Sequence, residues 1–109
     1  MTIENATVVD FITVDNESGD YWLSISDHLS WDEEAEHLLL LQEKVNSYLA
    51  FVENGELENG YPESRLKNVV INIGFKYPPP ALALQFIELA RTTLRGAGLE
   101  LRTELPLVN

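Results

Sequence analysis

The chain has 109 residues, of which 45% are hydrophobic, and it contains no cysteine. This length fits one domain, residues 1–109, and the lack of cysteine excludes disulfides, thiol catalysis and cysteine-ligated zinc. The 18 acidic and 7 basic residues give a formal net charge of −11. Such a charge disfavours binding to nucleic acid or an anionic membrane and favours a basic protein partner.

The first segment, MTIENATVVDF, has neither the basic start nor the apolar core of an export signal. No apolar run approaches the roughly 20 residues needed to cross a membrane. We therefore expect a cytoplasmic protein that does not bind membranes.

Residues 8–14 (VVDFITV) and 21–26 (YWLSIS) are rich in β-branched and aromatic residues and flank a loop containing Asn, Ser and Gly. This pattern predicts an antiparallel hairpin, with Val14 opposite Tyr21. One face would carry Val8, Ile12, Val14, Tyr21, Leu23 and Ile25. The opposite face would carry Val9, Phe11, Trp22, Ser24 and Ser26.

A helix is predicted to follow the hairpin. Ser30 and Glu33 have the spacing of a capping box, in which the serine oxygen accepts a backbone N–H of the first turn. Apolar residues then recur at three- and four-residue steps, which is typical of a core-facing helix. They are Leu38, Leu41, Val45, Leu49 and Val52, widened by Leu40 and Phe51. Asn54 and Gly55 are expected to end the helix, with Gly55 in a left-handed conformation.

The second half of the chain repeats the strand and helix pattern. Residues 69–77 (VVINIGFKY) alternate as a strand, three prolines end it, and a second helix is expected over 81–95. We expect this helix to turn Leu82, Phe86, Leu89 and Ala90 towards the core. Residues 99–105 alternate apolar and polar side chains and predict a final strand with one wet face.

These elements predict an α/β (α+β) two-layer sandwich in the order ββαβαβ. The last two connections should be parallel crossovers. We expect a four-stranded mixed sheet with two helices on one face, because the third and fourth strands each have one apolar and one more polar face.

Both histidines lie close to several carboxylates, in SDHLSWDEEAEH (residues 26–37). Ligands often lie beyond the carboxyl ends of the strands in α/β folds. The residues that could converge at this edge are Asp10, Asp27, His28, Glu34, His37 and Tyr77. The alternative is that the acidic residues favour a helix N-terminus and that Asp27 or His28 ties down a turn.

Glu34 and His37 have the Glu-x-x-His spacing of di-iron bundles. Those bundles need the motif twice, and here it occurs once, so the sequence predicts neither a metal nor another cofactor. No phosphate-binding loop or nucleophile elbow is present either. The sequence assigns no catalytic residue and favours a non-catalytic protein over an enzyme.

These observations favour a protein that acts by protein–protein interaction, as immunity proteins and inhibitors do. A basic protein is one candidate partner, and a homodimer is the other. The dimer would use the open back of the sheet or an edge beside it, through Val9, Phe11, Trp22 and Val70. Two alternatives stay open: an enzyme or metal-binding protein that uses Asp27, His28 and His37, and a self-associating structural protein.

Four segments carry a resemblance to a known family. They are ISDHLSW (25–31), HLLLLQEKVNSYLAFVENGEL (37–57), YPES (61–64) and VINIGFKYPPP (70–80). Together they resemble an uncharacterised family of small bacterial proteins, domain of unknown function 6572. The resemblance covers nearly the whole chain and implies a bacterial, single-domain protein, but no activity or catalytic residue.

Overall fold

The computed structural model describes residues 11–106. Its strands are β1 (Phe11–Val14), β2 (Tyr21–Asp27), β3 (Val69–Phe75) and β4 (Leu99–Glu104), and its helices are α1 (Glu34–Glu53), α2 (Glu56–Gly60), the 3-10 helix η1 (Pro62–Leu66) and α3 (Ala81–Gly96). The prediction of a four-stranded mixed sheet combined with helices is confirmed. The polar connection after α1 contains α2 and η1.

The strands lie in the order β1-β2-β3-β4. β1 and β2 are antiparallel, and Val14 lies opposite Tyr21 as the hairpin predicted. β2 pairs with β3, and β3 with β4, in parallel. The carboxyl ends of β2, β3 and β4 therefore lie at the same end of the sheet. The helices α1 and α3 also begin at this end.

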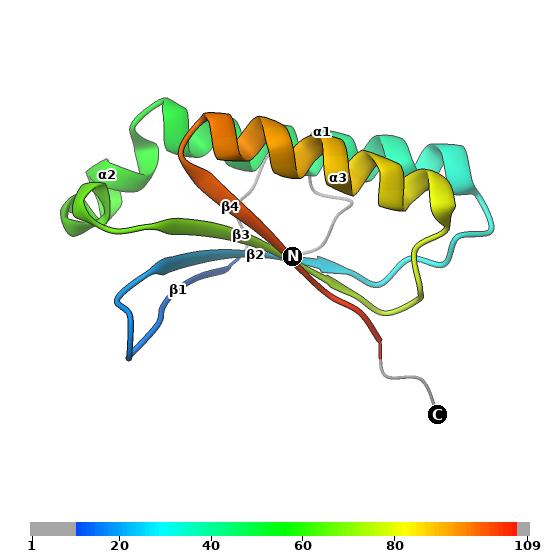
Figure 1. The fold of residues 1–109 in the computed structure, drawn as a ribbon, viewed down its shortest axis with the longest axis horizontal. Helices are drawn as coiled ribbons and strands as arrows, with labels where there is room; N and C mark the ends of the chain where they lie inside the picture. Colours follow the sequence, from blue (N-terminus) through cyan, green and yellow to red (C-terminus); the bar gives the residue numbers. More distant parts are fainter. Residues whose placement is uncertain (1–10, 107–109) are drawn as a thin grey trace.

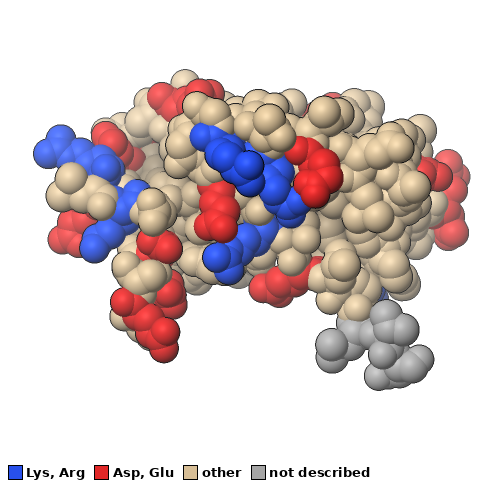
Figure 2. Space-filling view, in the orientation of Figure 1, with Lys and Arg blue, Asp and Glu red and all other residues tan. Residues whose placement is uncertain are grey.

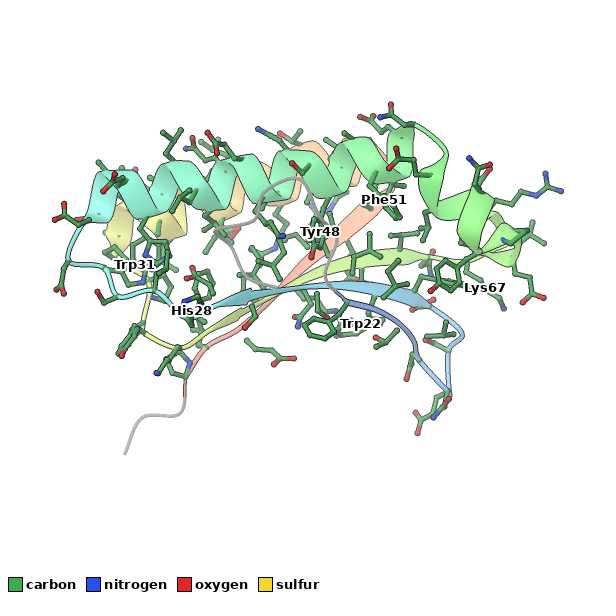
Figure 3. All side chains as sticks on the ribbon, turned by 180° about the vertical axis from the view of Figure 1, so that it is seen from behind. Trp22, His28, Trp31, Tyr48, Phe51 and Lys67 are labelled. Carbon is green, nitrogen blue, oxygen red and sulfur yellow. The ribbon has the colours of Figure 1, made fainter. Side chains whose placement is uncertain are left out.

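Figure 1 shows α1 and α3 side by side on one side of the sheet. The core lies between them and the strand residues that face the helices. Its largest members include Leu23, Ile71 and Tyr48, all fully buried. The Tyr48 hydroxyl donates to the Ser24 carbonyl at 2.7 Å, so it ties α1 to β2. Figure 3 shows Tyr48 between α1 and the strands.

The predicted cap of the first helix is wrong. α1 begins at Glu34 with Glu33 as its N-cap residue, and no side chain makes a capping hydrogen bond. The Ser30 hydroxyl instead donates to Asp32 Oδ2 at 3.1 Å. The turn before the helix thus uses the serine locally, as short polar side chains often do. The predicted end is confirmed: Gly55 follows α1 with a φ of +82°.

The orientation predicted for α3 is partly wrong. The buried residues are Ala83, Ile87, Ala90 and Leu94. Leu82 and Leu89, expected in the core, are 50% and 72% exposed. The apolar residues of α3 form two adjacent stripes, and only one of them can face the sheet. The second stripe, with Leu82, Phe86 and Leu89, is left at the side and outer surface of the helix.

Candidate functional site

Asp27 and His37 are the two candidate residues that the structure brings together. Asp27 ends β2, and His37 lies in the first turns of α1. The His37 Nε2 atom lies 2.7 Å from Asp27 Oδ1 and 2.6 Å from Oδ2. Both side chains are almost completely buried, with exposed fractions of 1% for Asp27 and 2% for His37. They form a short buried bridge between the sheet and the first helix.

The second ring nitrogen of His37 fixes where the protons lie. Nδ1 is 2.9 Å from the Ser30 carbonyl oxygen. A carbonyl can only accept, so Nδ1 carries a proton and donates it. A further proton must lie between Nε2 and Asp27, either on an imidazolium facing a carboxylate or on a carboxylic acid facing a neutral ring. In both arrangements the pair is neutral overall and both ring nitrogens are bonded.

Asp27 has partners on more than one side. Its Oδ1 accepts the Leu29 N–H at 3.2 Å, which stabilises the turn after β2. Its own backbone carbonyl accepts the Lys76 N–H at 2.9 Å. Burial raises the pKa of the Asp27 carboxyl, while the hydrogen bond and the charge of His37 act in the opposite direction. The low-polarity surroundings outweigh the partner, as expected for a buried carboxyl with little water.

Trp31 covers the face of the His37 ring. The two ring centroids are 3.5 Å apart and the planes are nearly parallel, at 16°. The Trp31 indole N–H donates to the Tyr77 carbonyl at 3.4 Å, a long hydrogen bond to the segment after β3. Trp31 was not among the residues predicted for this site. The sequence clue to its role was its position in the loop between Asp27 and His37.

A small hollow adjoins the pair. It has a volume of about 260 Å³ and is lined by Leu29, Ser30, Glu33, Glu36, His37 and Leu40. The nitrogens of His37 point to Asp27 and Ser30 and are therefore not available to a ligand in this hollow. Within residues 11–106, no group of three or more His, Cys, Asp and Glu side chains is placed to hold a metal ion. The arrangement holds β2, the following turn and α1 together.

The charge of His28, another candidate of this edge, also acts on the Asp27 carboxyl and lowers its pKa, against the larger effect of burial. His28 and Glu34 are exposed. Tyr77 is 41% exposed and takes part through its backbone carbonyl, not its hydroxyl. Asp10 lies outside the described residues. Among the described candidates, Asp27 and His37 form a buried pair, with the charge of His28 acting on Asp27 and Trp31 stacked on the imidazole.

The family comparison covers almost the whole chain. A family of unknown function, DUF6572, matches residues 1–107. The chain belongs to this family. Neither the curated proteins nor the solved structures contain a match. Within residues 11–106, no helix is long and apolar enough to cross a membrane.

The candidate interface on the back of the sheet is only partly accessible. Phe11 is 45% exposed, whereas Val70 is 1% exposed. Trp22 is half-buried, with the Arg102 guanidinium carbon 5.3 Å from the centre of its ring. β3 lies between the strands that carry these two residues, so this contact spans β3 on the back of the sheet. Val9 lies outside the described residues. Figure 3 shows Trp22 on the side of the sheet away from the helices.

A second apolar surface lies on the outside of the helices. A hollow of about 140 Å³ between α1 and α3 is lined by Val45, Asn46, Leu49, Phe86, Leu89, Ala90, Thr93 and Leu94. Leu39 on α1 and Leu82 on α3 are 55% and 50% exposed, and Leu89 is 72% exposed. We call Leu39, Leu49, Leu82, Phe86 and Leu89 the helix-layer patch. The sequence clue to this patch was the width of the apolar stripe in α3, which is too broad for all of it to face the sheet.

Proposed function

We propose that the protein acts by binding a basic protein partner through the helix-layer patch. The observation that carries this proposal is the exposure of Leu82 and Leu89 beside a helix, α1, whose exposed charges are all acidic. Exposed apolar side chains that form a continuous surface mark contact sites more often than single exposed residues do.

The apolar part of the surface follows from how the two long helices cover the sheet. We infer that α1 and α3 form one layer, joined by the crossovers of a ββαβαβ core, and that their outer sides are the binding face. From Tyr77 to Ile87 the chain has no charged residue. Figure 2 shows a broad uncharged area on the right of the view, where α3 begins in Figure 1. This surface contrasts with the acidic composition of the whole chain.

The charge on α1 supports a basic partner. Its charged residues are Glu34, Glu36, Glu43, Lys44 and Glu53. Lys44 is completely buried, while the four glutamates are exposed. A partner segment with lysines or arginines beside an apolar stripe would match both features. The hollow between two neighbouring helices suits an amphipathic helix, which can insert apolar side chains at three- and four-residue steps.

The test is affinity capture from cells with matched charge substitutions on two exposed leucines. Leu89→Glu introduces a charge into the helix-layer patch. Leu66→Glu is the control, because Leu66 is 80% exposed but lies on η1. We expect wild type and Leu66→Glu to capture the same basic partner. Leu89→Glu should fail to capture it. The double variant Glu36→Gln, Glu43→Gln should bind it more weakly than wild type.

Two outcomes would contradict this function. One is a captured protein that binds wild type and Leu89→Glu equally well. The other is a partner with an acidic surface, or one whose affinity does not change with salt. Circular dichroism of each variant would show whether a loss of binding comes from loss of the fold, which we do not expect for these exposed positions.

The alternative of an enzyme or metal-binding protein at Asp27, His28 and His37 has less support. Both nitrogens of His37 are bonded inside the fold, to Asp27 and to Ser30. A general base or a metal ligand needs one nitrogen directed at the reacting group or the ion. The immunity-like and inhibitor-like roles are specific forms of the proposed binding function, and the partner's identity would separate them.

A further inference from the structure

β4 is the last strand of the described sheet on its side, and it pairs with β3 alone. The outer edge of such a strand offers backbone N–H and C=O groups to another strand. The Leu101 carbonyl accepts Arg91 Nε at 3.4 Å. This carbonyl is therefore reached from outside the sheet, by a long hydrogen bond that an incoming backbone N–H could replace.

Most of the basic residues of this acidic chain lie around this edge, together with Glu58, Glu100 and Glu88, which binds Arg91. Arg91 and Arg95 line a hollow of about 290 Å³ together with Leu99, Glu100 and Leu101. Arg65 and Lys67 line another beside Gly98 and Leu99. With Arg102 on the strand itself, this places five of the 7 basic residues of the chain near β4. Figure 2 shows the Lys and Arg side chains gathered in the middle and on the left of this view.

We propose that two copies of the chain pair through the outer edges of β4, antiparallel, with Leu101 on the two-fold axis. This inference goes beyond the proposed function and does not rest on it, because it uses a different surface. Most surfaces of two chains with a net charge of −11 repel each other. At the β4 edge the nearby arginines and lysines reduce this repulsion locally, and salt screens the remainder beyond about 8 Å.

The polar face of β4 complements itself in this register. Glu100 and Arg102 stand on the back of the sheet, one residue to either side of Leu101. In an antiparallel pair centred on Leu101, Glu100 of each copy lies opposite Arg102 of the other. Two opposite-charge pairs therefore form across the axis, the kind of cross-strand pair that stabilises a sheet. The apolar face places Leu101 against Leu101 and Leu99 against Thr103.

In the single chain Arg102 points across β3 towards β2, away from the outer edge of β4, so pairing requires its side chain to turn outward. Its guanidinium lies over the Trp22 ring, and Nε donates to Glu100 of the same chain at 3.3 Å. The guanidinium carries five N–H donors, so after turning outward it can exchange the Trp22 ring for the Glu100 carboxylate of the other copy.

Other registers that keep both helix layers on one side are less favourable. Centring the pair on Arg102 would oppose Arg102 to itself and Glu100 to Glu104. Centring it on Thr103 would use only the last three residues of β4, which ends at Glu104. Glu104 also already accepts Asn72 Nδ2 at 3.2 Å. The Leu101 register uses five of the 6 residues of the strand and would join two four-stranded sheets into one.

Disulfide trapping tests both the pairing and the register, because the chain has no cysteine of its own. If the Leu101 carbonyl points outward, Leu101 forms the hydrogen-bonded pair, and Glu100 lies opposite Arg102 in the closer, non-hydrogen-bonded pair. Such a spacing suits a disulfide. A mixture of the Glu100→Cys and Arg102→Cys proteins should therefore form a covalent dimer under mild oxidation. Each variant alone should form far less, because its two cysteines are offset along the strands.

The control mixture contains Glu104→Cys and Arg102→Cys. In the Thr103 register Glu104 lies opposite Arg102. A covalent dimer from this control mixture, with none from the mixture of Glu100→Cys and Arg102→Cys, would show that register and overturn the proposed one. Analytical ultracentrifugation of the unmodified protein gives an independent measure. We expect a reversible dimer, and a monomer at every concentration up to the solubility limit would overturn the proposal.

Charge reversal adds a third measurement that needs no oxidation. Arg102→Glu places like charges opposite each other and should weaken dimerisation about tenfold. The double variant Glu100→Arg, Arg102→Glu restores opposite charges across the axis and should recover most of that loss. Equal dimerisation of wild type, the single variant and the double variant would show that another surface associates. Circular dichroism would confirm that each variant is folded.

Discussion

The imidazole of His37 is held between the Asp27 carboxylate, 2.6 Å from Nε2, and the Ser30 carbonyl, 2.9 Å from Nδ1. One side chain thus joins the end of β2, the turn that follows it and the start of α1. Trp31 closes the face of the ring, with a centroid separation of 3.5 Å. The most chemically suggestive cluster in the sequence therefore organises the fold, and this arrangement leads to direct predictions.

Removing the histidine should strongly destabilise the protein. In His37→Ala, Asp27 keeps the Leu29 N–H as a partner but loses the ring, and it remains buried. Leaving one member of a buried pair without the other costs about 3–5 kcal/mol of unfolding free energy. Urea denaturation followed by circular dichroism would measure the loss. Glu43→Ala on the exposed side of α1 is the control, with an expected change below about 0.5 kcal/mol.

The pH dependence of stability should contain a contribution from Asp27. Its pKa is raised by burial above the ordinary value of 3.8. The folded state therefore holds this proton more tightly than the unfolded state. The stabilisation it gives is fully present below the unfolded pKa and is lost as the pH rises through the higher, folded pKa.

Asp27→Asn removes this contribution and can still hydrogen-bond His37. We expect the difference in unfolding free energy between wild type and Asp27→Asn to change in favour of the variant as the pH rises from about 3 to 7. Urea titrations at a series of pH values would measure it. A difference that stays constant with pH would mean that Asp27 titrates alike in the folded and unfolded states.

The Ser30 hydroxyl should contribute little to stability. It bonds to exposed Asp32 and does not cap α1. Ser30→Ala keeps the backbone carbonyl that His37 uses, so we expect a change below about 0.5 kcal/mol. A capping serine would cost about 1 kcal/mol when replaced by alanine. A shift of that size in the denaturation midpoint would show that the hydroxyl caps the helix in solution.

Two leucines of α3 should respond very differently to truncation. Leu94 is 1% exposed and Leu89 is 72% exposed. Leu94→Ala should cost about 2–5 kcal/mol because it removes core contacts and leaves a cavity. Leu89→Ala should change the unfolding free energy by less than about 0.5 kcal/mol. Similar losses at both positions would mean that the buried side of α3 is not the one described.

The sequence was most informative where one periodic pattern dominated. The alternation of 69–75 placed Ile71 and Ile73 in the core, where both are fully buried. The pattern of α3 was ambiguous, because Leu82, Phe86 and Leu89 match a helical stripe as well as Ala83, Ile87 and Ala90 do. The choice between them depends on how closely the helix approaches the sheet, and this is a tertiary property that local spacing does not encode.

The candidate site shows a similar division. The grouping of Asp27 and His37 at the end of β2 could be predicted, because a turn and a helix start bring these positions together. The hydrogen bond to the Ser30 carbonyl could not, since it involves a backbone group that any residue supplies. Likewise, the contact between Trp22 and Arg102 joins strands that are not neighbours in the sheet, which the alternation within one strand does not encode.

The parallel pairing of β2, β3 and β4 has a consequence for how the chain folds. Tyr21 pairs with Val69, whereas Val69 pairs with Leu99, so the β3–β4 contact closes the shorter loop. Closing a longer loop costs more entropy, and distant pairings slow folding. We expect β3, α3 and β4 to assemble early, and the β1–β2 hairpin to dock on them later through α1. Pulse-labelled amide exchange during refolding should then protect Ile71 and Arg102, whose N–H groups face the β3–β4 pairing, while Leu23 and Ile25 still exchange.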